Sequence, residues 1–577
     1  MGKRRRPDAR SALWAALAAA LTAGLVIAAV AYSGGGTART KGANTKAPPD
    51  VVLYDGKVTT LGGPNSTVEA IAIRDGKILA TGRSGPIRAL AKRGTQIINL
   101  NGRRVLPGLI DGTLHGIRNS YHCFGQAVRH ELTFSRSEAL AAYAAKGAEL
   151  EADTWIFTTG GWNVNQLDVP GMFTRAELDD ALPNHPVRVQ GTGFSGVQVN
   201  SRALELLGLG PGSPGVELDG SGQPTGRLTG AASSASARAI GTQLEELTID
   251  EQAECMADFM REANRVGLTG WDDPGGNDPF DHQGRTIEAL REGHGFQAVN
   301  QLHRDGRMSN RVVLHLTSFE GLETVLRDTQ HAFSMIGDDL LRIGGPGEEI
   351  MSAVGGVYPL PEYQQIVDHL ARNRWNFQHH ATDAITQQTN LDAWEKANEV
   401  ASIADLNWVM LHPGDGPAHP SDETLDRLEA LSAGVVPTDS GATGGGTARP
   451  PYARIFNSGT RNCLGTDAMN AGPYAPFINL WYTISGKTLD PSAPGVVPEQ
   501  RLTRQQALRA ATSNCASFLD LEGKVGTLEP DRYADLIVLR EDYFRVPVDD
   551  IRTLTSVLTV VDGEIVNADG EFAGLDG

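Results

Sequence analysis

Five short apolar segments of the 577-residue chain each run into a side chain that can bind a metal ion or move a proton. They begin near residues 105, 341, 377, 408 and 462 and run to His115, Glu348, His379-His380, His412 and Asp467. Imidazole nitrogens and carboxylate oxygens are the ligands by which hydrolytic enzymes hold divalent metals. One such residue alone would more often be a packed histidine or a helix cap. Five at equivalent places predict one shared site for metal-assisted hydrolysis.

The segments that carry these residues alternate with helical stretches. Residues 254–266 have a helical pattern before the apolar run 268–271, and residues 362–374 precede the run 377–381 in the same way. This alternation is typical of βα units with a parallel sheet. In a (β/α)8 barrel the carboxyl ends of the strands meet at one mouth, where active sites lie. We therefore expect an α/β fold in which residues 105–523 form the barrel.

Both ends of the folded chain have a β pattern instead. Residues 50–104 contain β-branched runs and an Asp75-Gly76 turn. Residues 524–577 contain similar β-branched runs around Asp562-Gly563. Asp-Gly between such runs is a strong hairpin signal. The two ends together predict one small β-sandwich.

The amino terminus has the pattern of a targeting segment. A basic cluster that includes Lys3 and Arg10 precedes an uncharged run, Ser11 to Ser33. Residues 1–33 therefore predict a signal peptide or a signal anchor, with a transmembrane helix at about 11–33, and residues 34–49 predict a tether. Either segment would export the rest of the chain, the body from residue 50 onward. The body is then membrane-anchored and extracytoplasmic, or secreted if cleavage follows the small-residue stretch at 29–31.

Charge and cysteine content limit the partners and the covalent framework. The chain has 51 Lys and Arg against 69 Asp and Glu, a net charge of −18. This excludes nucleic-acid binding through the net field and leaves small neutral or cationic ligands, with an oligomer possible. The four cysteines are dispersed without a CxxC pair. We expect buried thiols, with two disulfides in any of three pairings as the alternative.

Several motifs together resemble the amidohydrolase superfamily, in the branch of N-substituted formamide deformylase and YtcJ-like proteins. They are Pro-Gly-Leu-Ile-Asp-x-x-x-His at 107–115, Gly-Gly-Trp at 160–162, Gly-x-Gly-Glu at 345–348, His-Ala-Thr at 380–382, Gly-Thr-Asp-Ala at 465–468, and the stretches 502–508 and 534–539. The resemblance implies a distorted (β/α)8 TIM-type barrel with a β-sandwich, a divalent metal, and hydrolysis of C–N bonds other than peptide bonds.

The first metal motif departs from this family. The first strand usually ends in His-x-His, whereas this chain has Thr113-Leu114-His115. Because a threonine hydroxyl is a poor zinc ligand, we favour one Zn²⁺ per chain over two, held by Glu348, His380 and His412. His115 and Asp467 complete the candidate ligand set. A second ion would need a replacement ligand, for which His122 and Cys123 are the candidates.

Further roles follow from strand geometry and from the chemistry of the site. Successive strand side chains point to opposite faces, so only one of His379 and His380 can enter the mouth. The resemblance to the His-Ala-Thr motif implies His380, and His379 then faces the helices, unless a bulge reverses the choice. Asp467 is the expected proton shuttle, with a purely structural or ligand role as the alternative. Trp162, Trp271 and Asp272 are candidate substrate contacts, although packing would equally explain the two tryptophans.

The function expected from this pattern is metal-dependent hydrolysis of a small amide, formamide or cyclic amide. Two alternatives stay open. One is a catalytically impaired binding protein on the same fold, because Thr113 removes a ligand. The other is a hydrolase of an ester or phosphoester, which metal-activated water also attacks.

Overall fold

The computed structural model describes residues 47–63, 67–121, 125–158, 160–191, 197–245, 247–275, 294–316, 321–330, 332–348, 350, 360–414, 418–445, 449–468 and 471–576. The chain divides into two units, residues 1–48 and 49–577, and the second holds the structure discussed below. Among the described residues no helix has the length and apolar character needed to cross a membrane. The helix expected at 11–33 lies outside the described residues, as do His122 and Cys123.

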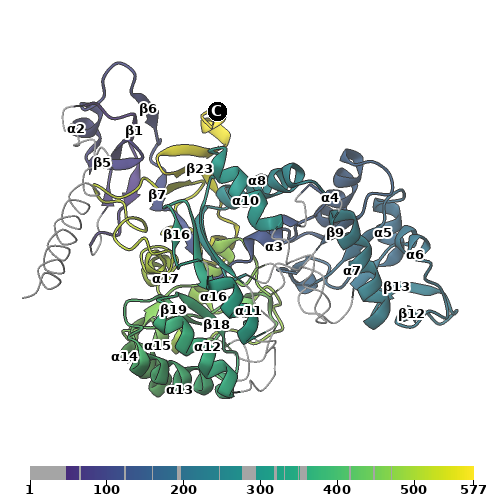
Figure 1. Cartoon of the computed structure of the whole chain (residues 1–577). Helices are drawn as coiled ribbons and strands as arrows, with labels where there is room; N and C mark the ends of the chain where they lie inside the picture. Colours follow the sequence, from purple (N-terminus) through teal and green to yellow (C-terminus); the bar gives the residue numbers. More distant parts are fainter. Residues whose placement is uncertain are drawn as a thin grey trace, which may run out of the picture. The chain divides into compact units, whose positions relative to one another are not determined.

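Two sheets of parallel strands form the centre of the second unit (Figure 1). One has the order β16-β17-β15-β14-β8, in which only the short β16 is antiparallel, and the other has the order β18-β19-β20-β21. Their strands are β8 (Leu109–Asp111), β14 (Leu268–Asp273), β15 (Arg311–Leu316), β16 (Ile336–Gly337), β17 (Leu341–Pro346), β18 (Phe377–His380), β19 (Trp408–Leu411), β20 (Gly434–Val436) and β21 (Arg461–Asn462).

Helices separate these strands along the chain, as the βα pattern predicts. They are α3 (Gly116–Tyr121), α8 (Ile249–Arg265), α10 (His294–Arg304), α11 (Leu322–Thr329), α12 (Leu360–Arg372), α13 (Ala384–Val400), α14 (Asp422–Ala430), α15 (Tyr452–Asn457), α16 (Pro476–Ser485) and α17 (Arg504–Ala510). The expected helix at 254–266 begins earlier, because Thr248 caps α8 and forms a capping box with Glu251. The expected helix at 362–374 is α12, displaced by two residues.

The two parallel sheets contact each other on both sides. On one side Gly112 N donates to Leu464 O at 2.9 Å, and Leu114 forms a parallel bridge with Ala468. On the other side His380 N donates to Glu348 O at 3.2 Å. The residues that follow β8, β17, β18 and β21 therefore converge.

A further six-stranded sheet, β24-β23-β22-β7-β2-β3, joins the two ends of the folded chain, and the sheet β5-β4-β1-β6 accompanies it. The strands are β1 (Val51–Tyr54), β2 (Lys57–Thr59), β3 (Thr67–Val68), β4 (Ala70–Arg74), β5 (Lys77–Gly82), β6 (Gln96–Asn99), β7 (Arg104–Pro107), β22 (Leu536–Leu539), β23 (Ser556–Val561) and β24 (Glu564–Ala568). One buried cluster contains side chains of both sheets, among them Leu53, Ile73 and Val538.

The predicted Asp-Gly hairpins form at both ends. Asp75-Gly76 and Asp562-Gly563 each adopt two consecutive positive φ angles, which the tight two-residue turn requires. The short α2 (Ser84–Arg88) covers part of the first sheet, where Ile87 packs with Val52.

A mixed sheet inserted between β8 and α8 was not anticipated from the sequence. It has the order β12-β13-β11-β10-β9 and lies to the right of the parallel strands in Figure 1. Its strands are β9 (Ile156–Thr158), β10 (Val187–Val189), β11 (Val197–Val199), β12 (Val216–Leu218) and β13 (Pro224–Leu228), and its helices are α4 (Arg136–Glu149), α5 (Arg175–Ala181), α6 (Ser201–Leu206) and α7 (Gly230–Glu245). Three-residue strands leave little periodicity for a sequence pattern to show.

The prediction of scattered buried thiols is wrong. Cys463, directly after β21, forms a disulfide with Cys515, and their Cα atoms lie 4.7 Å apart. Cys255 is disulfide-bonded as well, and no cysteine among the described residues is free. The partners are distant in the sequence and meet only through the packing of the chain, so cysteine spacing alone does not reveal them.

Candidate metal centre

Three side chains from three strand ends form a compact group of metal-ligand type. Glu348 follows β17, His380 ends β18 and His412 follows β19. Glu348 Oε1 lies 2.5 Å from His380 Nδ1 and 2.6 Å from His412 Nε2. One ligand atom from each residue lies within 4.8 Å of the others. A carboxylate and two imidazoles are one of the donor sets of catalytic zinc, which leave a position open for water.

His115 and Asp467 border this group. His115 Nε2 lies 3.0 Å from Asp467 Oδ1 and 3.4 Å from Glu348 Oε2. Because the carbonyl oxygen of Gly275 only accepts, His115 Nδ1 donates to it, at 2.6 Å. This bond directs Nε2 toward the two carboxylates and leaves its lone pair free in the neutral ring. All five predicted ligand residues thus come together.

Glycines allow Glu348 to approach the neighbouring strands. A Cβ atom on Gly345 would lie 2.0 Å from Asn376 O, and one on Gly347 would lie 2.1 Å from Pro274 O. Larger residues at either position would push the strand end away from its neighbours. The Gly-x-Gly-Glu motif therefore has a steric reason, the close backbone packing beside the carboxylate.

His412 and Asp467 have left-handed backbone conformations, with φ of 62° and 49°. Residues other than glycine seldom adopt such angles, and histidine and aspartate are among those that do so more often. Both backbones are held by hydrogen bonds, from His412 N to Val436 O and from Asp467 N to Thr113 O. Such strained positions concentrate at functional sites.

Three buried positioning residues escaped the sequence analysis. Asp111 accepts from Thr466 Oγ1 at 2.6 Å and so connects the first strand to the segment of Asp467. Asp273 accepts from the backbone of Gly275, whose carbonyl holds His115. Thr438 Oγ1 lies 3.1 Å from His412 Nδ1. Asp273 ends a strand and could have been chosen from its position, whereas Thr438 has no signal in the sequence.

The carboxylates differ in their proton affinity. Burial raises the pKa of Glu348, but the charges of His412 and His380 and their hydrogen bonds hold it well below its usual range. Burial also raises the pKa of Asp467, but the charge of His412 and the hydrogen bond and charge of His115 lower it by more. The pKa of Asp467 therefore lies below its usual value. Burial raises the pKa of Asp111 to about 7 despite hydrogen bonds from Thr466 and Thr113. The two carboxylates at the cluster are therefore the anionic ones.

Thr113 occupies the position of the missing histidine. Its side chain is fully buried, and its Oγ1 has no hydrogen-bond partner among the described residues. Its Cγ2 packs closely on Gly465, where a Cβ atom would lie 2.5 Å away. The hydroxyl is small and uncharged, so on this side His115 is the remaining imidazole.

The sequence of residues 96–567 matches the model of an amidohydrolase family. The chain belongs to this family. It is 23% identical over 573 residues to the N-substituted formamide deformylase of Arthrobacter pascens, covering 89% of this chain and 97% of the relative. It is also 29% identical over 183 residues to the putative amidohydrolase YtcJ of Bacillus subtilis, covering 31% and 34%.

Solved structures show the same fold. An uncharacterized metal-dependent hydrolase from Pyrococcus furiosus aligns with a TM-score of 0.57 at 19% identity, over 86% of this chain and all of that one. A zinc-bound mutant of the atrazine chlorohydrolase TrzN from Arthrobacter aurescens aligns with a TM-score of 0.50 at 15% identity, over 90% and 95%.

The two tryptophans expected near substrate are packed inside this amidohydrolase. Trp162 is buried beside His130 and Phe173 in the inserted region, and its Nε1 donates to Gln190 O. Trp271 is buried against Phe259 of α8, on the helix side of β14. Both rings are fully buried and packed, and a contact with substrate stays a prediction.

Asp272 on β14 and His379 on β18 are also buried, but they face different layers of the fold. Asp272 accepts from Gln378 Nε2 at 2.5 Å and lies 2.9 Å from His315 Nε2. The Gln378 amide satisfies Asp272 Oδ2, whereas Oδ1 makes no hydrogen bond to a described residue. His379 packs on Tyr363 of α12, so it faces the helices as the strand alternation predicts. His380, on the other face, carries the nitrogen that meets Glu348.

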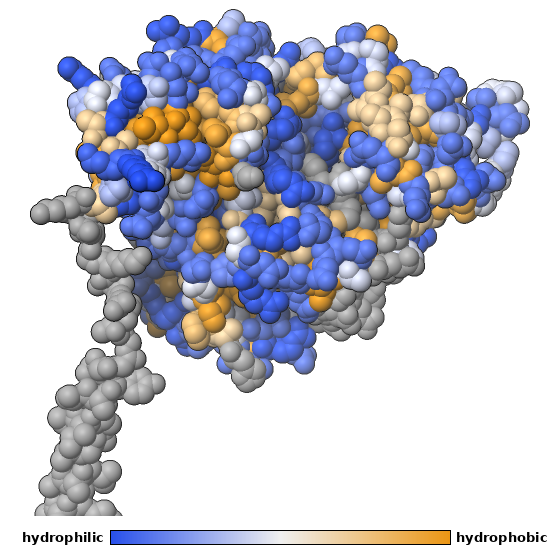
Figure 2. Space-filling model, turned by 90° about the horizontal axis from the view of Figure 1, so that it is seen from above, coloured by the Kyte–Doolittle hydropathy of each residue, from blue (hydrophilic) through white to orange (hydrophobic). Residues whose placement is uncertain are grey.

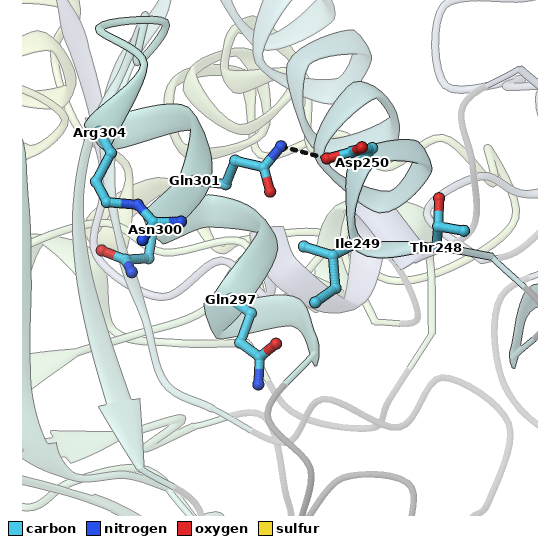
Figure 3. A pocket seen from close by; sticks show the side chains of 7 residues that line it. All are labelled: Thr248, Ile249, Asp250, Gln297, Asn300, Gln301 and Arg304. Carbon is cyan, nitrogen blue, oxygen red and sulfur yellow. Dashed lines mark hydrogen bonds between the residues drawn. The ribbon is translucent and has the colours of Figure 1, made fainter.

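A hollow of about 460 Å³ lies away from this cluster, between α8 and α10 (Figure 3). It is lined by Thr248, Ile249, Asp250, Gln297, Asn300, Gln301 and Arg304. Gln301 Nε2 donates to the Asp250 carboxylate at 2.6 Å. The hollow contains neither a histidine nor a pair of carboxylates, so we assign no catalytic step to it.

Proposed function

We propose that this amidohydrolase uses one divalent metal to hydrolyse C–N bonds, other than peptide bonds, in a small amide, formamide or cyclic amide. The observation that carries the proposal is the convergence of Glu348, His380 and His412, with Asp467 and His115 at its edge. The donor set fits a divalent metal, because the three ligand atoms already face one another.

A divalent ion held by Glu348, His380 and His412 would lower the pKa of a water molecule and polarise the substrate carbonyl. Asp467, kept anionic, accepts a proton from the attacking water as the new C–O bond forms. It then donates that proton to the departing amine nitrogen as the C–N bond breaks. Gly275 O fixes the ring of His115, whose Nε2 lies 3.0 Å from Asp467 Oδ1. The backbone of Asp467 is held by its hydrogen bond to Thr113 O, so the shuttle keeps one orientation.

We infer that β8, β14, β15, β17, β18, β19, β20 and β21 make a distorted (β/α)8 barrel with the cluster at its mouth. The parallel order of both sheets and their contacts on two sides support this closure. We also infer that the sheets from the two chain ends pack as a β-sandwich, since one buried cluster unites them.

The substrate class rests on the names of the relatives. The similar proteins include an N-substituted formamide deformylase, and the solved structures include a zinc-bound adenosine deaminase. A panel of formamides, acyclic amides and lactams offered to the metal-loaded enzyme tests the proposal. Cleavage of esters or phosphoesters alone would favour a hydrolase of those bonds. Tight binding without turnover would favour a catalytically impaired binding protein.

Purified protein is expected to hold close to one divalent ion per chain, most readily zinc, because Thr113 leaves a single complete ligand triad. Elemental analysis of the full chain measures this ratio. Two tightly held ions would contradict it and would point to a replacement ligand such as His122. In a Thr113→His variant, a rise in occupancy would show a latent second site.

We further propose that residues 1–33 export the body and that an uncleaved helix at about 11–33 anchors it. The basic residues before this helix stay on the cytoplasmic side. Protease added to intact cells is then expected to degrade the body, and a tagged cytosolic protein serves as the control. A body that stays protected in cells with an accessible outer surface, with no released form, would contradict this placement.

A further inference from the structure

The sheet β5-β4-β1-β6 and its helix α2 carry a cationic surface, although the protein as a whole is strongly acidic. Residues 76–104 contain seven Lys and Arg and no Asp or Glu, although the chain as a whole has a net charge of −18. Four of these cations, Arg83, Arg88, Lys92 and Arg93, are exposed on α2 and its flanking loops. No ion pair joins any of the four to another described residue. Their charge is therefore available to a partner.

Exposed apolar side chains lie on the same face of the sheet. Leu90 is 38% exposed and Ile97 is 49% exposed. Ile97 stands opposite Val52, which packs under α2, so Ile97 shares that face. On the left of Figure 2, which looks down on the region of α2 and β6, orange apolar surface lies among blue hydrophilic side chains. We call Arg83, Arg88, Leu90, Lys92, Arg93 and Ile97 the α2 face.

The charge of the α2 face is positive even when neighbouring acids are included. The Glu69 carboxylate accepts from Ser84 N at the start of α2, and Asp55 N donates to Ser84 Oγ. Asp50 is a third neighbouring acid, since its backbone carbonyl accepts from Gln96 N and its carboxylate accepts from Asp75 N. Three acids therefore lie near four cations, and the net charge is still positive. The Arg88 guanidinium lies 4.2 Å from the centre of the Tyr54 ring, which positions this cation on the α2 face.

The α2 face also lies where the body receives its amino-terminal segment. Gln96 N donates to Asp50 O at 2.8 Å, and Thr95 Oγ1 donates to Pro49 O at 2.8 Å. The expected tether therefore enters beside Ile97. A segment as long as residues 34–48 can span at most about 50 Å. An anchor at residues 11–33 would hold this end of the body near the bilayer at high effective concentration.

We propose that the α2 face docks on the anionic lipid surface of the membrane that holds the anchor. Lys and Arg clusters beside an anchor bind anionic headgroups, and exposed apolar side chains insert at the interface. The surface attracts these cations although the rest of the body is acidic, because screening limits the repulsion to about 8 Å at physiological salt. The inference rests on the proposed membrane anchoring and not on the hydrolytic chemistry.

The test uses the full chain reconstituted in vesicles, with Leu90→Cys carrying an environment-sensitive fluorophore. Leu218→Cys on β12, where the leucine is 44% exposed, is the matched control. In vesicles that contain phosphatidylglycerol, brominated lipid is expected to quench the dye at 90 at least several-fold more than the dye at 218. High salt, or substitution of the four cations by Gln, is expected to abolish the difference while turnover stays unchanged.

Each other outcome overturns a defined part of the account. Equal quenching at both positions, or quenching that is as strong in pure phosphatidylcholine, would refute the anionic docking. A change in dye emission that depends on protein concentration without vesicles would assign the face to a second copy of the chain. Failure of the full chain to float with vesicles would refute the anchor itself, whereas flotation without quenching would refute only the docking.

Discussion

Replacement of Asp467 by Asn is expected to slow turnover by a factor of about 10² to 10⁴, the usual loss when a general acid-base group is removed. The amide can neither accept the proton of water nor deliver one to the amine. Asn tolerates the left-handed backbone that Asp467 adopts, so the fold should persist. Steady-state kinetics with metal content measured on the same sample check the result.

Asp520→Asn is the matched control, because Asp520 also has a positive φ but lies at the surface, paired with Arg342. This variant is expected to keep its activity. If Asp467→Asn retained both metal and near-normal turnover, Asp467 would not be the shuttle. If it lost its metal, Asp467 would act first as a ligand, the alternative open from the sequence.

Replacement of Glu348 by Gln is expected to remove most of the metal and to lower activity by more than about 100-fold. The loss of a partner of a metal ligand already costs 10- to 100-fold, so the loss of a ligand should cost more. Glu348 is also the acceptor that His380 and His412 share. Metal titration of the apoprotein, followed by calorimetry, measures the change in affinity.

Glu362→Gln serves as the control for this change, since Glu362 only accepts from Leu322 N, at the start of α11. It is expected to bind metal normally. Unchanged metal affinity in Glu348→Gln would place the ion elsewhere, for example between His115 and Asp467. Recovery of activity at high metal concentration would show that only binding, and not the reaction, depends on this carboxylate.

The convergence of the candidate ligand residues could be predicted because each follows an apolar strand, where local sequence and position coincide. Strand alternation required that only one of His379 and His380 enter the mouth, and the resemblance to the His-Ala-Thr motif selected His380. The positioning residues could not, because Thr438 and Asp111 act through contacts between strands that are distant in the chain. Trp162 shows the same limit, since the sequence allowed either a substrate contact or packing, and its ring is buried in the inserted region.

In the fold, too, the features that depend on local sequence could be predicted, and those that depend on long-range packing could not. The hairpins at Asp75-Gly76 and Asp562-Gly563 depend on local turn chemistry and form where predicted. A third Asp-Gly pair, Asp55-Gly56, makes no hairpin, because β1 and β2 belong to separate sheets and the pair connects them. The disulfide of Cys463 and Cys515 likewise depends on how β21 packs against a later segment, which spacing does not encode.

The most direct test of the central claim is amine release from a formamide and lactam panel by the full chain, before and after removal of metal. The account predicts C–N cleavage that chelation abolishes and that about one equivalent of zinc per chain restores. It also predicts that Asp467→Asn stays inactive at the same metal content. Turnover that survives complete metal removal, or a fully loaded protein that cleaves no C–N bond in the panel, would contradict it.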